Sequence, residues 1–287
     1  MTSYRIYADS ACDLKPETLD SWGVPYECLT FRFDGDGVEY SNNDMPVSEF
    51  YDRMRKGGVA KTAAVNSEAF ANAFEKILAS GEDILYLGFS SGLSTTYNSA
   101  RIAADGLKEK YPERKIIVVD TLSASAGIGL IIRLVIDKKN SGATIEEAAE
   151  YVEKLKFKLC HWFTVDDLMY LKRGGRISPT VAFVGNMLGI KPVLHMDDDG
   201  HLVNMFKVRG RKTSILALAD KYGELADEKD GIAFISNADC LDEANELKER
   251  LEEKYGARVE IITDVGPVIG AHSGPGTMAL FFVGKNR

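Results

Sequence analysis

The sequence has few cysteines and histidines and no long apolar run. Four cysteines and four histidines occur among 287 residues, and Cys12, Cys28, Cys160 and Cys240 include no Cys-x-x-Cys pair. This spacing argues against a structural zinc site and against a disulfide framework. No apolar run approaches the ~20 residues that cross a bilayer, and the first residues pass directly into a strand-like segment rather than a signal peptide. We therefore expect a cytoplasmic protein that holds no metal ion or cofactor.

The sequence also lacks an excess of positive charge and any recognisable nucleotide-binding motif. Its formal net charge is -8, which argues against nucleic acid as a partner because such partners require a basic face. It contains no Gly-x-x-x-x-Gly-Lys-Ser/Thr loop and no set of protein-kinase motifs. We therefore expect that the chain does not hold ATP.

In the first half of the chain, short apolar runs alternate with amphipathic segments. The runs at 84–87 and 116–119 are separated by segments with helical spacing of apolar residues at 67–78 and 94–107. Buried runs that alternate with helices predict a parallel sheet covered on both faces. In such a sheet, ligands bind at the carboxyl ends of the strands.

The second half has a different pattern. Apolar runs at 193–196 and 202–206 flank Asp197-Asp198-Asp199-Gly200, which predicts a hairpin. Further apolar runs at 232–235, 259–262 and 280–283 complete a mixed sheet. The predicted fold is therefore α/β, with an N-terminal parallel-sheet domain over residues 1–160 and a C-terminal mixed-sheet domain over residues 161–287.

The loop at 88–97 follows a predicted strand and opens a predicted helix. Its hydroxyls and free N–H groups suit an anion, although the same residue types also serve as helix caps. The loop contains Gly-x-Ser-x-Gly with Ser90 at the nucleophile position, and Asp239 or Asp264 and then His272 follow in α/β-hydrolase order. A serine esterase is therefore the alternative function. It is weakened because no His-Gly-Gly-Gly-like oxyanion loop precedes Ser90 and the second half lacks repeated βα units.

Two more positions are candidates for binding a polar group. His272 lies in a segment rich in glycine and proline, 265–276. Glycine lets the backbone approach a ligand closely, and histidine can donate a hydrogen bond to an oxyanion. Thr62 precedes a helix that Asn66 or Ser67 would cap, so its hydroxyl is free for another role. An ordinary structural role is the alternative for both residues.

Six short motifs, spread along nearly the whole chain, occur together in one order. They are Asp9-Ser10-Ala11-Cys12-Asp13-Leu14, Ser90-Ser91-Gly92-Leu93-Ser94, Asp120-Thr121, Leu171-Lys172-Arg173-Gly174-Gly175-Arg176-Ile177, Leu188-Gly189-Ile190-Lys191-Pro192-Val193-Leu194 and Ile269-Gly270-Ala271-His272-Ser273-Gly274-Pro275-Gly276. This set resembles the DegV family of bacterial fatty-acid-binding proteins. An ordered set of separated motifs is more specific than any one motif alone.

The resemblance implies one long-chain fatty acid bound between two α/β domains. It implies that Thr62, Ser94 and His272 hold the fatty-acid carboxylate. It also implies that a separate ATP-dependent kinase subunit phosphorylates the bound acid to an acyl phosphate for phospholipid synthesis, so that this chain is a binding subunit and not an enzyme. Ala63-Ala64-Val65-Asn66 follow Thr62 where the family often has serine and proline, and we expect the geometry around the carboxylate to differ there.

Two further groups of residues are expected to serve the ligand and the partner. The candidates for lining the acyl tail are Phe163, Leu168, Phe183, Met187, Leu188, Ile190 and Val193. The arginines expected at a partner surface are Arg173, Arg176, Arg209 and Arg211, with Arg173 and Arg176 projecting outward beside Gly174-Gly175. Such a surface would steer an acidic kinase or make brief contact with an anionic membrane, and ordinary solvated charge is the alternative.

Overall fold

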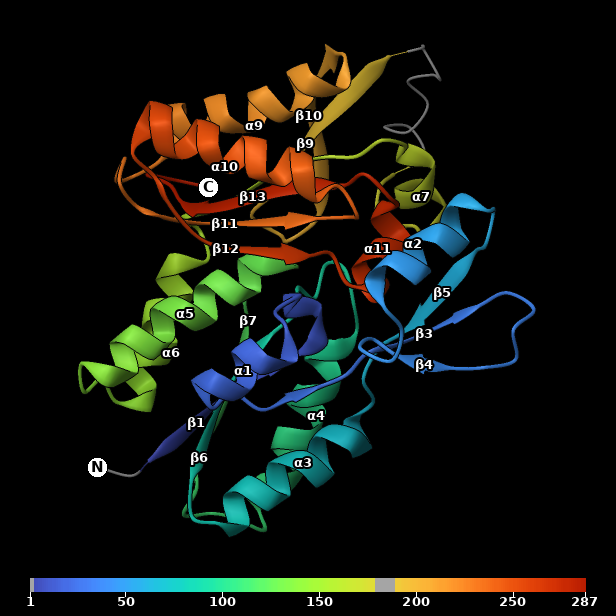
Figure 1. Ribbon diagram of the computed structural model, residues 1–287. Helices are drawn as coiled ribbons and strands as arrows, with labels where there is room; N and C mark the ends of the chain where they lie inside the picture. Colours follow the sequence, from blue (N-terminus) through green and yellow to red (C-terminus); the bar gives the residue numbers. More distant parts are fainter. Residues whose placement is uncertain (1–2, 179–188) are drawn as a thin grey trace.

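The first sheet of the protein is parallel, as predicted. The structure, a computed structural model, describes residues 3–178 and 189–287 (Figure 1). The sheet has the order β2-β1-β6-β7, and its neighbouring strands all pair in parallel. Its strands are β1 (Tyr4–Asp9), β2 (Tyr26–Glu27), β6 (Asp83–Gly88) and β7 (Ile116–Asp120). All six residues of β6 are buried, which is why this strand reads as a continuous apolar run.

Helices cover both faces of this sheet. One face carries α3 (Ser67–Ala79) and α4 (Thr96–Lys108), and the other carries α5 (Ala126–Asn140) and α6 (Ile145–Leu155) (Figure 1). The short elements η1 (Ser10–Cys12) and α1 (Pro16–Trp22) follow β1. Asn66 caps α3 by accepting a hydrogen bond from the backbone N–H of Ala69 at 2.8 Å, so the capping role predicted for Asn66 or Ser67 falls on Asn66.

The second sheet is mixed, also as predicted. Its order is β10-β9-β8-β13-β11-β12, where β11 and β12 pair in parallel and the other pairs are antiparallel. Its strands are β8 (Leu159–Thr164), β9 (Ile190–Met196), β10 (Leu202–Arg209), β11 (Ile232–Asn237), β12 (Arg258–Asp264) and β13 (Met278–Val283). The predicted hairpin is β9–β10, and Gly200 takes a φ of +75° in its turn, a conformation that favours glycine. Helices α9 (Arg211–Leu225) and α10 (Leu241–Tyr255) cover the outer face (Figure 1).

A third, small sheet was not predicted from the sequence. It consists of β3 (Thr30–Phe33), β4 (Tyr40–Ser41) and β5 (Ala60–Ala63), and α2 (Val47–Arg55) packs beside it. These strands have only two to four residues, too few for a clear alternating pattern. A separate aromatic cluster that includes Phe31, Phe50 and Tyr51 forms its core. This cluster also contains Val265 and Ala271 from the end of the chain, so the small sheet is attached to the second half of the protein.

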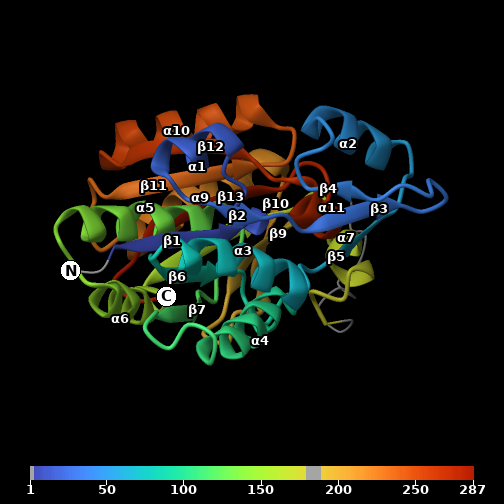
Figure 2. The same cartoon turned by 90° about the horizontal axis from the view of Figure 1, so that it is seen from below.

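The two large sheets share a core between them, and the face of the second sheet under α9 and α10 has a core of its own. Helix α5 lies between them, with contacts to β6 on one side and to β11 and β13 on the other, and Figure 2 shows the same stacking seen from below. A single cluster of buried apolar residues continues from Ile6 to Phe281. The expected division after residue 160 falls at the start of β8, the first strand of the second sheet along the chain. The division into an N-terminal parallel-sheet domain and a C-terminal mixed-sheet domain is confirmed, and the exact boundary at residue 160 stays a prediction, because one cluster of buried apolar residues runs through both parts.

Candidate functional site

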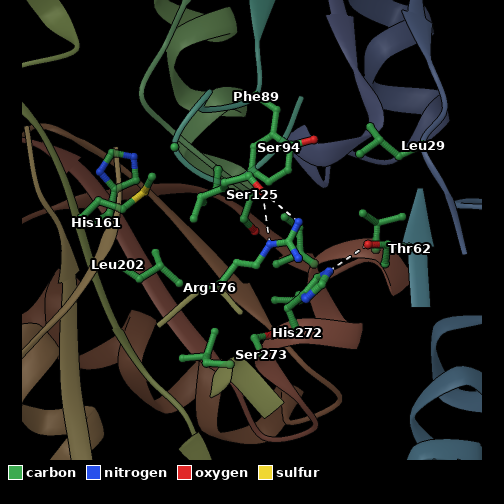
Figure 3. Close-up of a pocket in the computed structure, with 18 of the residues that line it drawn as sticks. Leu29, Thr62, Phe89, Ser94, Ser125, His161, Arg176, Leu202, His272 and Ser273 are labelled. Atoms are coloured by element: carbon green, nitrogen blue, oxygen red, sulfur yellow. Dashed lines mark hydrogen bonds between the residues drawn. The ribbon is translucent and has the colours of Figure 1, made fainter. Parts of the chain in front are cut away.

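A cavity of about 520 Å³ lies where the three sheets meet. It lies at the carboxyl ends of β6 and β7, where Phe89, Ser94 and Ser125 of the loops after these strands supply part of its wall (Figure 3). This is the edge at which a parallel sheet is expected to bind a ligand. The rest of the wall includes residues of β5, β8, β9, β10, β11 and β13 and of the short helices α7 (Leu168–Arg173) and α11 (Pro267–Ser273). The cavity therefore draws on residues from nearly the whole length of the chain.

Thr62 and His272 are paired in the wall of this cavity. The hydroxyl oxygen of Thr62, on β5, lies 2.8 Å from Nε2 of His272, on α11 (Figure 3). Burial and, to a lesser extent, the positive charge of Arg176 together lower the pKa of His272 to about 4. The imidazole is therefore neutral at pH 7. Nδ1 of His272 is buried and makes no hydrogen bond within the described part of the chain.

Gly174 packs directly against the His272 ring and leaves no space for a side chain between them. A Cβ atom added to Gly174 would lie only 2.1 Å from Nδ1 of His272, so no other residue type fits without moving the imidazole. The contact arises because α7 packs against α11. The first glycine of the Arg-Gly-Gly-Arg motif, Gly174, thus provides the space that the His272 ring occupies at the site.

Ser94 lines the same cavity from the loop between β6 and α4. Its hydroxyl accepts a hydrogen bond from the backbone N–H of Thr96 at 3.2 Å and lies 2.9 Å from the Thr96 hydroxyl. A serine hydroxyl has one donor and two acceptor positions, so Ser94 can pair with Thr96 and still meet a ligand. The structure thus brings Thr62, Ser94 and His272 into the wall of one cavity.

Arg176 is placed differently from the expectation that it projects outward. Its guanidinium turns into the cavity wall, where Nε and Nη2 donate to the carbonyl oxygen of Leu93 at 3.2 and 3.0 Å, and Nη1 donates to that of Gly174 at 2.6 Å (Figure 3). Gly175 takes a φ of +71°, which reverses the chain direction just before Arg176. Arg176 remains charged because a guanidinium is not deprotonated in proteins, although burial lowers its pKa. The prediction that the Arg176 side chain projects outward is therefore wrong.

The apolar part of the cavity only partly matches the expected tail-lining residues. Phe163 is in the wall, together with Phe89, Leu171, Met196, Leu202 and Phe281. Leu168, Ile190 and Val193 are not among the described residues that line the cavity, and Val193 instead packs in the core under α9 and α10. Phe183, Met187 and Leu188 lie outside the described residues.

The geometry around Ser90 does not support the esterase alternative. The Ser90 side chain is fully buried and donates a hydrogen bond to the carbonyl oxygen of Gly200 at 2.9 Å. His272 is paired with Thr62 instead. Another serine–histidine pair, Ser123 and His161, has a separation of 2.7 Å, but Nδ1 of His161 faces the Arg287 guanidinium at 3.5 Å. A catalytic triad requires an acidic residue at that nitrogen.

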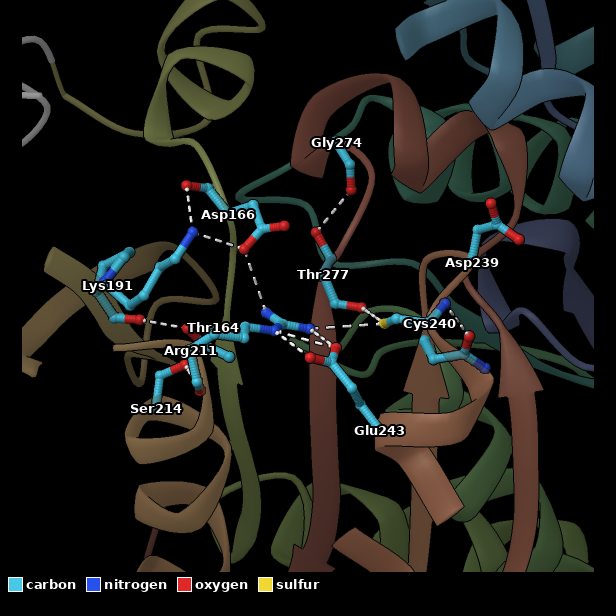
Figure 4. Close-up of polar contacts among 12 residues, drawn as sticks. Thr164, Asp166, Lys191, Arg211, Ser214, Asp239, Cys240, Glu243, Gly274 and Thr277 are labelled. Atoms are coloured by element: carbon cyan, nitrogen blue, oxygen red, sulfur yellow. Dashed lines mark hydrogen bonds and ion pairs between the residues drawn. The ribbon is translucent and has the colours of Figure 1, made fainter. Parts of the chain in front are cut away.

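Arg211, expected at the partner surface, is engaged in an ionic network (Figure 4). Its Nη2 lies 2.6 Å from a carboxylate oxygen of Glu243, and its Nη1 lies 3.6 Å from Asp166, which also pairs with Lys191 at 2.7 Å. Only 20% of the Arg211 side chain is exposed. Its charge is therefore largely compensated, whereas Arg173 and Arg209 are exposed.

No cluster of three or more His, Cys, Asp or Glu residues that could hold a metal ion occurs in the described ranges. None of the helices formed by residues 3–178 and 189–287 has the length and apolar character needed to cross a bilayer.

Several known proteins are similar to this chain in sequence and in fold. A DegV domain-containing protein from Clostridium perfringens is 41% identical over 100% of this chain and 99% of its own length. A fatty acid-binding protein from Thermotoga maritima is 35% identical over 96% of this chain and 95% of its own length. The crystal structure of a stearic acid-binding protein from Eubacterium ventriosum is 28% identical, with a TM-score of 0.88 over 98% of both chains. The family model described as "Uncharacterised protein, DegV family" matches residues 3–285, and this chain therefore belongs to the DegV family.

Proposed function

We propose that this protein binds one long-chain fatty acid, with the carboxylate at Thr62, Ser94 and His272 and the tail in the apolar part of the cavity. The observation that carries the proposal is the Thr62–His272 pair in the wall of a cavity of about 520 Å³. Ligand cavities typically have an apolar wall with a few converging polar groups. Fatty-acid binding by the relatives from Thermotoga maritima and Eubacterium ventriosum supports the same ligand class.

The proposed head-group site uses hydroxyl donors that a histidine orients. We assign the proton of the neutral His272 ring to Nε2, which then donates to the Thr62 oxygen. The alternative tautomer would bury an unpaired N–H at Nδ1, where the described residues offer no acceptor. With its oxygen acting as an acceptor, Thr62 is free to donate its own hydrogen to the carboxylate. Ser94 supplies a second hydroxyl, and the charge of Arg176 in the same wall favours an anion there.

The affinity of this site would come mainly from the tail. Burial stabilises a bound acyl chain by roughly 0.8 kcal/mol for each CH₂ group. The hydroxyl groups then need only fix the position of the carboxylate, and they leave its oxygens more reactive than a bidentate arginine pair would.

The finer part of the proposal is that a separate ATP-dependent kinase subunit receives the carboxylate and forms an acyl phosphate for phospholipid synthesis. The sequence has no nucleotide-binding loop of its own, which supports a division of labour between a binding protein and a kinase. We propose that this exchange takes place in the cytoplasm, and that the exposed Arg173 and Arg209 contribute to contact with the kinase or, briefly, with an anionic membrane.

Mass spectrometry of the ligand tests the proposal. The protein is purified, denatured and extracted, and the amount of fatty acid per chain is measured. We expect close to one long-chain fatty acid per chain for the wild type and clearly less for Ser94→Ala. An empty wild-type cavity that also takes up no added fatty acid would contradict the proposal.

A further inference from the structure

A second hollow adjoins the head-group end of the cavity on its outer side. It has a volume of about 540 Å³, and Thr62, Ala63, Arg176 and His272 contribute to the walls of both hollows. The outer hollow is further lined by Arg32 on β3, Lys61 on β5 and Arg173 at the end of α7. We call it the vestibule. The elements that surround it lie together on one side of the molecule in both views (Figures 1 and 2).

The walls of the vestibule are strongly basic, although the protein as a whole is acidic. Four cations, Arg32, Lys61, Arg173 and Arg176, line it, and Glu39 is its one carboxylate among the described residues. Lys61 forms an exposed ion pair with Asp34 at 2.8 Å. Neither Arg32 nor Arg173 takes part in an ion pair within residues 3–178 and 189–287. A chain with a net charge of -8 thus concentrates uncompensated positive charge beside the proposed head-group site.

Two of these cations face each other across neighbouring strands. Arg32 and Lys61 are directly opposite partners in the antiparallel pair β3–β5, and both are exposed. Like charges at directly opposite positions destabilise a sheet. Asp34 compensates the charge of Lys61 in part, and an anion bound between Arg32 and Lys61 would reduce the remaining repulsion, which favours an anionic ligand.

We infer that the vestibule is a phosphate site, in which Arg32, Lys61 and Arg173 bind phosphate groups next to the fatty-acid carboxylate. The inference rests on the proposed function, because a carboxylate at Thr62 and His272 would lie at the wall that the two hollows share. Arginine and lysine side chains are the usual protein ligands of phosphate. The phosphate chain of a nucleotide donor and the phosphate of an acyl-phosphate product share this chemistry.

The reaction that such a site would assist is balanced without any further reactant. One carboxylate oxygen forms a bond to the terminal phosphorus of the donor. The bond from that phosphorus to the bridging oxygen breaks, and its electron pair leaves with the diphosphate. No proton is transferred, and cations next to the phosphate oxygens stabilise the charge that they carry during transfer.

Tripolyphosphate is a suitable probe because it carries the phosphates of a donor without its base and sugar. Its binding to fatty-acid-loaded protein is measured by calorimetry at low ionic strength, with Arg32→Gln/Arg173→Gln compared with Arg101→Gln/Arg250→Gln. The control pair removes the same charge from exposed arginines outside the vestibule. We expect the vestibule variant to bind tripolyphosphate at least tenfold more weakly and the control to bind it as the wild type does. The fatty-acid content of both variants should equal that of the wild type.

A second arm separates the two possible sources of the phosphate. The cavity is loaded with an alkylphosphonate of matched chain length in place of the fatty acid. If this ligand depends on Arg32 and Arg173 for retention and blocks tripolyphosphate, the site serves the phosphate of the product. If tripolyphosphate still binds, the site serves the donor. Failure of the vestibule variant to weaken either ligand, with fatty acid still bound, would overturn this inference alone, whereas a wild-type protein that takes up no fatty acid would overturn the proposed function.

Discussion

The hydroxyl oxygen of Thr62 lies 2.8 Å from Nε2 of His272, although 210 positions separate the two residues in the sequence. This contact connects the small sheet to a helix that precedes the last strand of the second sheet. It brings together two side chains whose polar groups have no other protein partner among the described residues. A pair arranged in this way is suited to receive a third polar group from a ligand.

Replacing the Thr62 hydroxyl should weaken ligand retention. Thr62→Val keeps the shape of the side chain but removes the group that would donate to the carboxylate. Since a hydrogen bond to a charged group contributes about 1.5–3 kcal/mol, we expect the fatty-acid dissociation constant to rise by at least tenfold. Competition with a fluorescent fatty acid measures this change. Thr18→Val, on α1 and away from the cavity, is the control and should bind normally.

Gly174→Ala should disturb the site through His272 alone. The added methyl group would overlap Nδ1 of His272, so the ring must move away from Thr62. Gly106→Ala is the matched control, because a Cβ at Gly106 meets no atom within 4 Å and alanine favours its helix by roughly 0.5–1 kcal/mol. We expect loss of fatty acid from the first variant and a slightly higher melting temperature for the second. Equal fatty-acid content in the two variants would show that the ring position is unimportant.

The contribution of His272 to the stability of the protein should fall as the pH decreases from about 6.5 towards 4. Burial lowers the pKa of His272 to about 4 in the folded state, whereas an unfolded histidine has a pKa of about 6.5. The unfolded state therefore binds more protons in this range, and linkage makes the free energy of unfolding decrease with decreasing pH. In urea unfolding without ligand at pH 7.5 and pH 5, the decrease should be smaller for His272→Gln. Asp13, whose pKa burial raises to about 7, acts with the opposite sign in both proteins, so comparing them isolates His272.

Arg176 and Arg209 should have separable roles. Arg176 donates three hydrogen bonds in the cavity wall, whereas Arg209 is exposed. We therefore expect Arg176→Gln to lower the fatty-acid content and Arg209→Gln to leave it unchanged. If Arg209 contacts the kinase, its variant should form acyl phosphate more slowly at low salt, and added salt should reduce the difference. Normal fatty-acid content in Arg176→Gln would contradict a role in fatty-acid binding and would favour a role of Arg176 in contact with the partner.

Ser90 should not react with a fluorophosphonate. Its hydroxyl is buried and donates a hydrogen bond to the carbonyl oxygen of Gly200, and no histidine or acidic side chain of the described residues is hydrogen-bonded to it. Intact-mass measurement after long exposure to the reagent should give an unmodified protein. Stoichiometric labelling that disappears in both Ser90→Ala and His272→Ala would instead support the alternative function, a serine esterase.

The sequence predicted the large sheets well because their strands are buried and apolar. The runs at 84–87 and 116–119 and the hairpin turn at Gly200 have strong local signals. The small sheet was missed because its strands have only two to four residues, too few for a clear alternating pattern. The outward direction expected for Arg176 was wrong because its guanidinium donates to the carbonyl oxygen of Leu93, 83 positions earlier in the chain, a contact that no local pattern reveals. The proximity of Thr62 and His272 was likewise beyond local signals, and only the resemblance to a family suggested it.

The order of strands in the second sheet has a consequence for synthesis of the protein. The last strand along the chain, β13, occupies an inner position and pairs with both β8 and β11. Until β13 has left the ribosome, the strands on its two sides have no common partner. His272, Ala279 and Phe281 of the cavity wall arrive with the same final segment. A nascent chain therefore has no complete cavity until β13 has been synthesised, and ligand uptake must follow that point.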